Sequence, residues 1–392
     1  MVYRIFQYFR DAFRRCDKIL LLLCVITNIF GCLVIASTTA STNSGPVRYV
    51  VMQIVASLAG IVCYVIISSI DATTFSEHRL SLVIFNTVLL LMLIPFGTDM
   101  GSGNRSWLDF PFLPFNIQPA EVCKITYVLI MASVMASRQN NISSPLSIGH
   151  MLLHLGLIFG LNMVLSRDMG VSLIFAFIFV AMTFCGGVSW FWYLTAGGIV
   201  AVTAPLAWNF VLSGYQKNRI AVLFNPELDA QGTGALYHTM RALKSLTGGG
   251  MTGQGLFEGY RTQHGLLFAQ HTDFIFSAIG EELGFLGCGF ALLLLALIVI
   301  RCVWVGSNTH DYMRRLICIG TASALIFQIV INIGMNVGVM PVIGLTLPFI
   351  SYGGSSIISL YAMMGLVSGV FARPVAPSHE RYIKAPMRTI HF

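Results

Sequence analysis

The chain has 392 residues, of which 56% are hydrophobic and only 10% are charged, and its mean hydropathy is +0.78. A soluble domain usually carries about a quarter of its residues as charged side chains. The composition therefore excludes an ordinary soluble enzyme and predicts an all-α polytopic membrane protein. The net charge of +7 indicates membrane topology and contact with anionic lipids, with no need to invoke nucleic acid.

Apolar stretches long enough to cross a hydrocarbon core of about 30 Å recur along the whole chain. They lie at 19–37, 49–70, 80–97, 119–137, 148–166, 169–186, 190–212, 274–301, 313–337 and 346–371. We therefore expect about ten transmembrane helices, with one long loop, 213–273, between the seventh and the eighth. The chain then divides into an N-terminal segment 1–18, a membrane domain 19–372 and a tail 373–392.

The basic residues predict which side of the membrane each connection faces. With ten spans both termini share one side, and that side holds 14 of the 23 Lys and Arg residues. Short cytoplasmic loops of membrane proteins are enriched in Lys and Arg. We therefore expect both termini in the cytoplasm and loop 213–273 outside the cell.

A charged pair lies inside the fourth apolar stretch. Glu121 and Lys124 are three residues apart, so a helix would place them on one face where they can pair. Charged residues at membrane depth are costly and mark candidate functional sites. Either the pair fixes helix packing, or its cation is held for an anionic substrate. Gln118 and Pro119 open the same helix, and proline suits a first turn.

Further polar residues lie at the expected outer ends of the spans. These are Arg105 and Trp107 before the fourth span, Asp168 between the fifth and sixth, Arg219 after the seventh, and Asp273 where loop 213–273 returns to the membrane. Several cations and carboxylates are thus expected to converge on one membrane face. An acid at the entrance of an apolar helix, as at Asp273, is a functional-site hypothesis by default.

The last two spans contain segments rich in Asn, Pro, Gly and Ser, at 332–341 and 347–356. Non-helical backbone at membrane depth is tolerated only where it is buried in protein or lines a wet cavity. Packing of small residues would explain the glycines but not the neighbouring Pro, Tyr and Asn. We therefore predict broken helices around a cavity.

A glycine-rich run occupies residues 248–255 of the long loop. It lacks the Gly-Lys-Ser/Thr ending of a phosphate-binding loop. It is therefore predicted to be a flexible, tightly turning loop.

Taken in order, these motifs resemble those of the SEDS family (shape, elongation, division and sporulation), the RodA, FtsW and SpoVE peptidoglycan glycan polymerases. The resemblance runs from about residue 20 to residue 372. The matching segments are Arg105-Ser106-Trp107-Leu108, Gln118-Pro119-Ala120-Glu121 with Lys124, Asp168-Met169-Gly170, Arg219-Ile220, His271 to Phe276, and Met340 to Ser356. The chain departs from the family pattern at Leu267-Phe268-Ala269, where the family has Leu-Pro-Glu.

The resemblance implies an inverting glycosyl transfer that polymerises lipid II and releases undecaprenyl diphosphate. Asp273 would be the base that accepts the proton of the acceptor hydroxyl. Lys124 and Arg105, with Arg219, would neutralise the diphosphate, and Glu121 would orient Lys124. The other residues expected to bind substrate are Trp107, Gln118, Asp168, His271, Thr272, Ser351, Tyr352 and Ser355. No cofactor is certain, although a divalent cation, Mg²⁺ or Mn²⁺, could share the neutralisation of charge.

The resemblance also implies a bacterial plasma membrane protein with an outward-facing active cavity and a class B penicillin-binding protein transpeptidase as its partner. It does not separate a role in elongation from one in division or sporulation. Two other functions stay open. A lipid II flippase or other precursor transporter would also need a polar cavity among broken helices. A non-catalytic scaffold of the wall-synthesis complex is the other, and glycan formation by the purified protein would exclude both.

Overall fold

The computed structural model describes residues 10–41, 45–99, 104–110, 116–210 and 236–373, with the short stretch 225–229 and a few further positions between 211 and 235. Nine helices in these ranges are long and apolar enough to cross a membrane, and α9 is a tenth, shorter apolar helix. Their bounds are α2 Lys18–Thr38, α3 Gly45–Ser69, α5 Arg79–Leu91 continued by α6 Leu93–Phe96, α7 Pro119–Ser137, α8 Pro145–Leu165, α9 Met169–Cys185, α10 Trp190–Phe210, α14 Ile275–Ser307, α15 Tyr312–Asn336 and α16 Gly354–Ala372. The predicted all-α polytopic membrane fold is confirmed.

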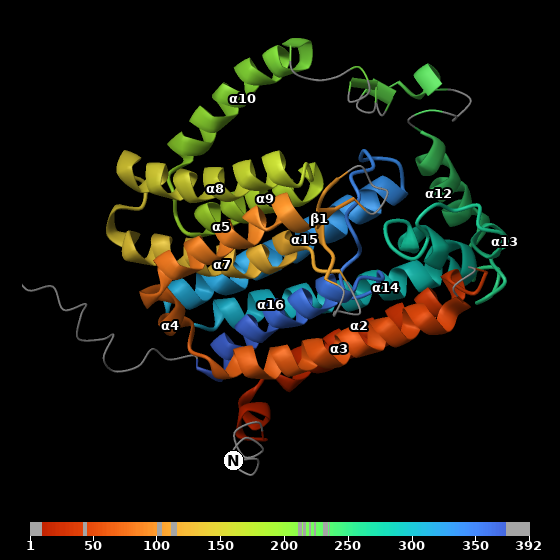
Figure 1. Ribbon diagram of the computed structural model, residues 1–392, viewed down its shortest axis with the longest axis horizontal. Coiled ribbons are helices and arrows are strands. Elements are labelled where there is room, and N and C mark those ends of the chain that lie inside the picture. Colours follow the sequence, from red (N-terminus) through yellow and green to blue (C-terminus); the bar gives the residue numbers. More distant parts are fainter. Residues whose placement is uncertain are drawn as a thin grey trace, which may run out of the picture.

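Short elements connect these helices at the two ends of the bundle. Figure 1 shows α4 (Ala72–Glu77) at one end, and α12 (Tyr237–Gly248) and α13 (Tyr260–Gln263) at the other. Strands β1 (Gly97–Thr98) and β2 (Trp107–Leu108) pair antiparallel before α7. The short 3-10 turns η1 (Gln139–Asn141) and η2 (Pro226–Asp229) complete the set in the described part.

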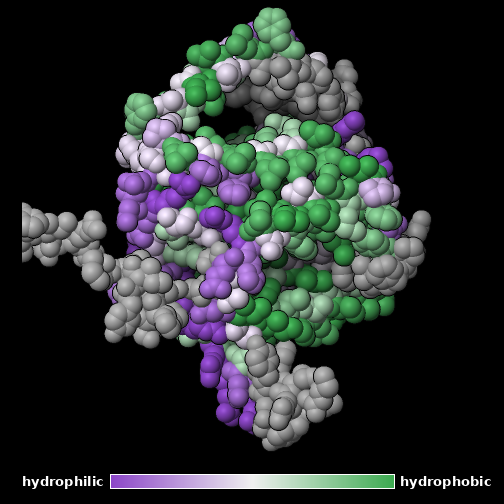
Figure 2. All heavy atoms as spheres, turned by 60° about the vertical axis from the view of Figure 1, so that its left-hand side comes forward, coloured by the Kyte–Doolittle hydropathy of each residue, from purple (hydrophilic) through white to green (hydrophobic). Residues whose placement is uncertain are grey.

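Many large hydrophobic side chains lie on the surface of the bundle. Large hydrophobic side chains such as Leu33, Leu153 and Phe285 are more than half exposed. Figure 2 shows a broad hydrophobic area that adjoins a smaller hydrophilic region. Lipid can cover such a surface, whereas water would leave it unstable. Helix α10 leans away from the bundle in Figure 1, and none of its apolar window is buried.

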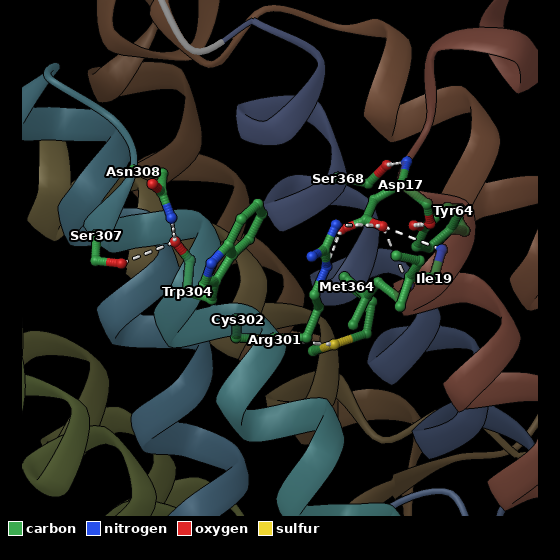
Figure 3. Close-up of polar contacts among 11 residues, drawn as sticks. Asp17, Ile19, Tyr64, Arg301, Cys302, Trp304, Ser307, Asn308, Met364 and Ser368 are labelled. Atoms are coloured by element: carbon green, nitrogen blue, oxygen red, sulfur yellow. Dashed lines mark hydrogen bonds and ion pairs between the residues drawn. The ribbon is translucent and has the colours of Figure 1, made fainter.

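Four helices are joined at the end of the bundle expected to be cytoplasmic. The Asp17 carboxylate caps α2 by accepting the backbone N–H groups of Ile19 and Leu20. The Arg301 guanidinium of α14 binds the same carboxylate with two hydrogen bonds, of 2.8 and 3.1 Å. The Tyr64 hydroxyl of α3 donates to the Asp17 carbonyl, and the Ser368 hydroxyl of α16 accepts its N–H. Figure 3 shows these contacts, which fix the helix ends relative to one another.

The last two apolar stretches fold differently from their sequence pattern. Helix α15 continues to Asn336, so Asn332 and Asn336 lie inside a helix and do not break it. The irregular backbone begins afterwards, at 337–353, and α16 starts at Gly354 although the apolar stretch starts at 346. Phe349 and Gly344 of this segment adopt left-handed backbone angles, with φ of 63° and 72°.

Helix α14 is interrupted nine residues after its N-terminal residue Ile275, at Gly284. Gly284 has φ 66° and ψ −163°, which no α-helix contains. Residues 248–255, here called the glycine strap, fill the break. The strap pairs with both sides of the break through four backbone hydrogen bonds: Phe285 N to Gly250 O, Leu286 N to Met251 O, Gln254 N to Glu281 O, and Gly255 N to Glu282 O. The strap is therefore packed against α14, which the sequence pattern did not indicate.

Candidate active site

A buried ion pair lies at the start of α7. The Lys124 ammonium is 2.8 Å from a carboxylate oxygen of Glu121, and their side chains are 0% and 4% exposed. The i, i+3 spacing brings them together on one helix face, as the sequence predicts. Because Lys124 is so thoroughly buried, its charge acts in a medium that screens it weakly.

Asp168 joins three helix N-termini next to this pair. Its carboxylate caps α9 by accepting the N–H of Val171 at 3.0 Å. The same carboxylate accepts the Gln118 side-chain amide of α7 at 3.3 Å. The backbone N–H of Gln118 in turn donates to the Ser355 hydroxyl at the start of α16. Residues that are far apart in the sequence are thus brought into one polar group.

Asp273 lies two residues before α14 and is partly buried. Burial raises the pKa of its carboxyl to about 6; a hydrogen bond with the Thr272 side chain opposes this rise, and the charge of Asp168 adds to it. Burial also raises the pKa of Asp168, which receives opposing influences from Glu121 and Lys124. The two aspartates and the ion pair therefore belong to one electrostatic group.

The backbone around Asp273 is held by the irregular segment 337–353. The Ser351 hydroxyl donates to the Thr272 carbonyl at 2.6 Å, and the Tyr352 N–H donates to the His271 carbonyl at 2.9 Å. The His271 ring lies 5.8 Å from the Tyr352 ring, and burial lowers the pKa of His271. Ser351 and Tyr352, expected to bind substrate, are thus engaged with the chain that carries Asp273.

Some expected site residues are not joined to this group. Arg105 is exposed, and its guanidinium donates to the Gly97 carbonyl at 3.1 Å within its own hairpin. Trp107 is half-buried in β2, where it pairs with Thr98. Arg219 lies outside the described residues. Of the three cations expected, Lys124 is the one that lies among the carboxylates of the described site.

Three buried polar residues that the sequence analysis did not assign to the site support it. The Gln53 side chain of α3 donates to the Ser351 carbonyl and accepts the N–H of Gly353, both at 3.2 Å. The Asn332 and Asn336 amides of α15 donate to the Asp273 carbonyl at 2.9 and 3.0 Å. Polar side chains inside apolar spans were the available signal, but the sequence did not indicate their partners.

No group of three His, Cys, Asp or Glu side chains that could hold a metal ion occurs among the described residues. Mg²⁺, however, is commonly bound by one or two carboxylates together with substrate phosphates. Asp168 is a carboxylate of this kind beside Asp273, so the donor chemistry fits a cation that is held in part by a bound phosphate group.

The expected cavity stays a prediction. Two cavities in the described part lie elsewhere, one among α5, α7 and α8 and the other at the turn between α7 and α8. Neither is lined by the segment 337–353.

The sequence pattern of a family described as cell cycle protein, with the members FtsW, RodA and SpoVE, matches residues 16–373. The chain belongs to the FtsW/RodA/SpoVE family. It is 31% identical over 356 residues to the peptidoglycan glycosyltransferase MrdB of Escherichia coli K12, covering 90% of this chain and 93% of that protein. It is 30% identical over 317 residues to the stage V sporulation protein E of Bacillus subtilis, covering 79% and 83%.

Solved structures have the same fold. One is described as "Structural coordination of polymerization and crosslinking by a peptidoglycan synthase complex". Its matching chain is 28% identical to this one and superposes with a TM-score of 0.77, and the match covers 91% of this chain and 97% of that chain. The Thermus thermophilus rod shape determining protein RodA, at 24% identity, has a TM-score of 0.67 and covers 92% and 98%. The latter likeness concerns the fold alone.

The departure from the SEDS pattern before Asp273 leaves the local turn formed. Ala269 adopts φ 44°, and its carbonyl accepts the N–H groups of Thr272 and Phe274. The chain therefore reverses in front of Asp273 without the family's proline and glutamate. This turn places Asp273 directly before Phe274, the N-cap residue of α14.

Proposed function

We propose that this SEDS protein is a peptidoglycan glycosyltransferase that polymerises lipid II and releases undecaprenyl diphosphate. The observation that carries the proposal is the polar group itself, in which the charge of Asp168 acts on Asp273 and the buried Glu121–Lys124 pair acts on Asp168. A sugar hydroxyl is a poor nucleophile, so a positioned base typically contributes about 10² to 10⁴ in rate.

Asp273 acts as this base in our proposal. A pKa of about 6 leaves most of its carboxyl ionised at pH 7 and makes the carboxylate more basic than an ordinary aspartate. It accepts the proton of the acceptor hydroxyl as the oxygen attacks the anomeric carbon of the donor, which inverts that carbon. The departing diphosphate requires charge neutralisation and no proton donor, so the acid pair of a glycosidase is unnecessary.

Lys124 neutralises the diphosphate, and Glu121 orients Lys124 through their 2.8 Å contact. Arg105 and Arg219 are proposed to add positive charge from the outer loops when substrate is bound. A divalent cation, Mg²⁺ or Mn²⁺, held by Asp168 and the diphosphate would add further charge neutralisation when bound and would leave Asp273 free to act as the base. Gln118, through its hydrogen bond to Asp168, holds that carboxylate in place.

We also propose that the site faces outward, that both termini are cytoplasmic, and that a class B penicillin-binding protein is the partner. The position of the basic residues supports this orientation, because Arg301, Arg314 and Arg373 lie at helix ends remote along the chain from Asp273 and follow the positive-inside pattern. The polyprenyl tails of lipid II would then remain in the bilayer while its sugars reach Asp273.

The test is Asp273→Asn, with Glu258→Gln as the control because Glu258 is an exposed carboxylate of the same loop. We expect Asp273→Asn to insert and melt like wild type while its consumption of lipid II falls to background. The control should polymerise normally. Near-normal turnover by Asp273→Asn would exclude this residue as the base, and absence of glycan product from wild type would contradict the polymerase assignment itself.

A further inference from the structure

Asn336 occupies an unusual place at the start of α14. In a continuous helix the Ser277 N–H would donate to the carbonyl of Asp273, four residues earlier. Here the Asn336 side chain lies between the two groups. Its amide donates to the Asp273 carbonyl at 3.0 Å, and its oxygen accepts the Ser277 N–H at 3.0 Å, an N–H that it shares with the Phe274 carbonyl at 3.1 Å. The Asn336 side chain of α15 thus takes the place of one helical hydrogen bond of α14, because it binds both the acceptor and the donor of that bond.

Asn332, one turn earlier on α15, extends this arrangement. Its amide also donates to the Asp273 carbonyl, at 2.9 Å, and to the Leu345 carbonyl, at 2.7 Å. The Asn336 amide additionally donates to the Asn332 carbonyl at 2.8 Å. The Asn pair therefore links α15, the start of α14 and the irregular segment 337–353 at a single backbone carbonyl.

Burial makes this hydrogen-bonding arrangement costly to break. Both asparagines are 0% exposed, and an unpaired buried amide typically costs about 1–3 kcal/mol. The Ser277 hydroxyl also donates to the Asn336 oxygen, at 2.6 Å, so both ends of that side chain are satisfied. Rotation of the Asn336 side chain would break hydrogen bonds at both ends together, which holds the Asp273 backbone in one conformation.

The consequence concerns the direction of the Asp273 side chain. If the Ser277 N–H donated to the Asp273 carbonyl, α14 would extend back to include Asp273. The Asp273 carboxyl would then take the direction that this helix gives it. With the carbonyl held by the Asn pair, Asp273 stays in the turn before α14, near Gly344 and within reach of the Asp168 charge. The side chain is then placed by α15, a helix that carries no candidate catalytic residue.

We infer that Asn336, supported by Asn332, is a positioning residue that prevents α14 from extending over Asp273 and thereby aims the Asp273 carboxyl at the reacting hydroxyl. This inference rests on the proposed function for its catalytic meaning, but the structural part stands without it. A displacement of about 1 Å at a catalytic group can cost about 10² in rate.

The test compares Asn336→Leu with Gln328→Leu. Gln328 is a matched control because it is also buried on α15, two turns earlier than Asn336, at 2% exposure. We expect Asn336→Leu to lower kcat by about 10² while KM for lipid II changes little. Gln328→Leu should keep kcat. Equal kcat losses in the two variants, or an unchanged kcat in Asn336→Leu, would overturn the inference.

Asn336→Asp provides a second, gentler variant. It keeps the acceptor for Ser277, and it regains a donor for the Asp273 carbonyl only when its new carboxyl is protonated. The activity of Asn336→Asp relative to wild type should therefore fall as pH rises, whereas that of Asn336→Leu should stay constant. Asn336→Leu adds no charge, so its ratio to wild type cancels the titration of Asp168, His271 and Asp273. The charge of Asn336→Asp would raise the pKa of Asp273 and by itself make the ratio rise with pH, so a fall reports the lost donor. A constant ratio for Asn336→Asp contradicts the inference.

Hydrogen exchange separates this inference from the proposed function. The Ser277 amide should exchange faster in Asn336→Leu than in wild type or in Gln328→Leu, with no lipid II present. Faster exchange together with a wild-type protein that makes no glycan would retain the positioning role and reject the polymerase. Unchanged exchange at 271–277 would reject the positioning role, whatever the activity.

Discussion

At the scale of single residues, the site is governed by the interaction between neighbouring charges. Asp168 and Asp273 belong to different connections, yet the charge of Asp168 contributes to the raised pKa of Asp273. The sequence indicated both residues because polar groups at the ends of apolar spans are costly. It could not indicate the hydrogen bond between Gln118 and Asp168, because that contact depends on how α7 and α9 pack.

The raised pKa of Asp273 predicts the acidic limb of the pH–rate profile. The base acts as a carboxylate, so the rate should fall as pH drops through about 6. Asp168→Asn removes a negative charge, which lowers the pKa of Asp273, and should move this limb to lower pH. Asparagine still caps a helix well, so α9 should remain formed.

The measurement is kcat/KM for lipid II from about pH 5 to about pH 8, roughly one unit below the expected limb to about two units above it. Glu258→Gln, at an exposed carboxylate remote from Asp168 in the chain, should leave the limb in place. A limb that stays fixed or moves to higher pH in Asp168→Asn would show that Asp273 does not set the profile.

At the scale of elements, the glycine strap and α14 depend on each other. The break at Gly284 leaves backbone donors and acceptors that a membrane helix must satisfy internally. The strap satisfies four of them. Glu281, just before the break, accepts the N–H groups of Arg261 and Thr262, which fixes α13 beside it. The strap and α13 are therefore part of the structure that carries Asp273 into α14.

This dependence predicts that adding one methyl group to the strap will lower both the stability and the activity of the protein. A Cβ at Gly249 would overlap the Gly280 carbonyl oxygen, although φ of −85° at Gly249 suits any residue. Gly249→Ala must therefore displace the strap, and overpacking of this kind typically costs about 1–3 kcal/mol. We expect a lower melting temperature and reduced polymerisation.

Gly289→Ala is the control for this substitution. Gly289 lies in α14, the helix that the strap contacts, at a position where a Cβ would meet open space. Alanine at an interior helix position is favoured over glycine by about 0.5–1 kcal/mol, so this variant should melt at the same temperature as wild type or higher. If Gly249→Ala melts like Gly289→Ala, the strap does not support α14.

The sequence predicted the spans better than their ends. Ten apolar stretches became ten apolar helices, because hydrophobicity over about 20 residues determines insertion. The density of Asn, Gly and Pro after residue 332 was interpreted as a helix break, but Asn332 and Asn336 bond to neighbouring segments and the helix continues past them. The glycine strap looked flexible because its partners, Glu281 and Glu282, come later in the chain. Both the unbroken helix at Asn332 and Asn336 and the packing of the strap depend on tertiary contacts, which the sequence pattern does not contain.

At the scale of the whole molecule, the two ends of the bundle differ in what holds them. Asp17, Arg301 and Tyr64 join the helix ends directly at one end. At the other end, loops and irregular backbone carry the candidate site and are held by hydrogen bonds to α14 and α15. Loop-borne sites respond more easily to a docked protein than helix-borne ones, because local opening costs less there. This difference indicates where a partner could change the activity.

The last prediction is that a class B transpeptidase binds this protein and raises its polymerase activity. Helix α14 offers a surface for a single membrane span, because Phe285, Leu286 and Leu293 are 67%, 60% and 55% exposed. This surface begins directly after the break that the glycine strap fills, so a partner bound there would bias the strap and, through α14, Asp273. Polymerisation by the isolated chain should be weak, and it should rise with the cognate partner even when the transpeptidase serine of that partner is mutated.

Two double variants test where the partner acts. Leu286→Ala with Leu293→Ala on α14 should weaken binding and stimulation while the activity of the isolated chain stays as in wild type. Leu194→Ala with Val200→Ala on α10, whose side chains are 73% and 60% exposed, is the matched control and should leave stimulation intact. Since both pairs remove similar apolar area from the lipid-facing surface, general effects on insertion should be equal. Full activity of the isolated chain, unaffected by a partner that does bind, would mean that the outer elements already hold Asp273 in its working position without help.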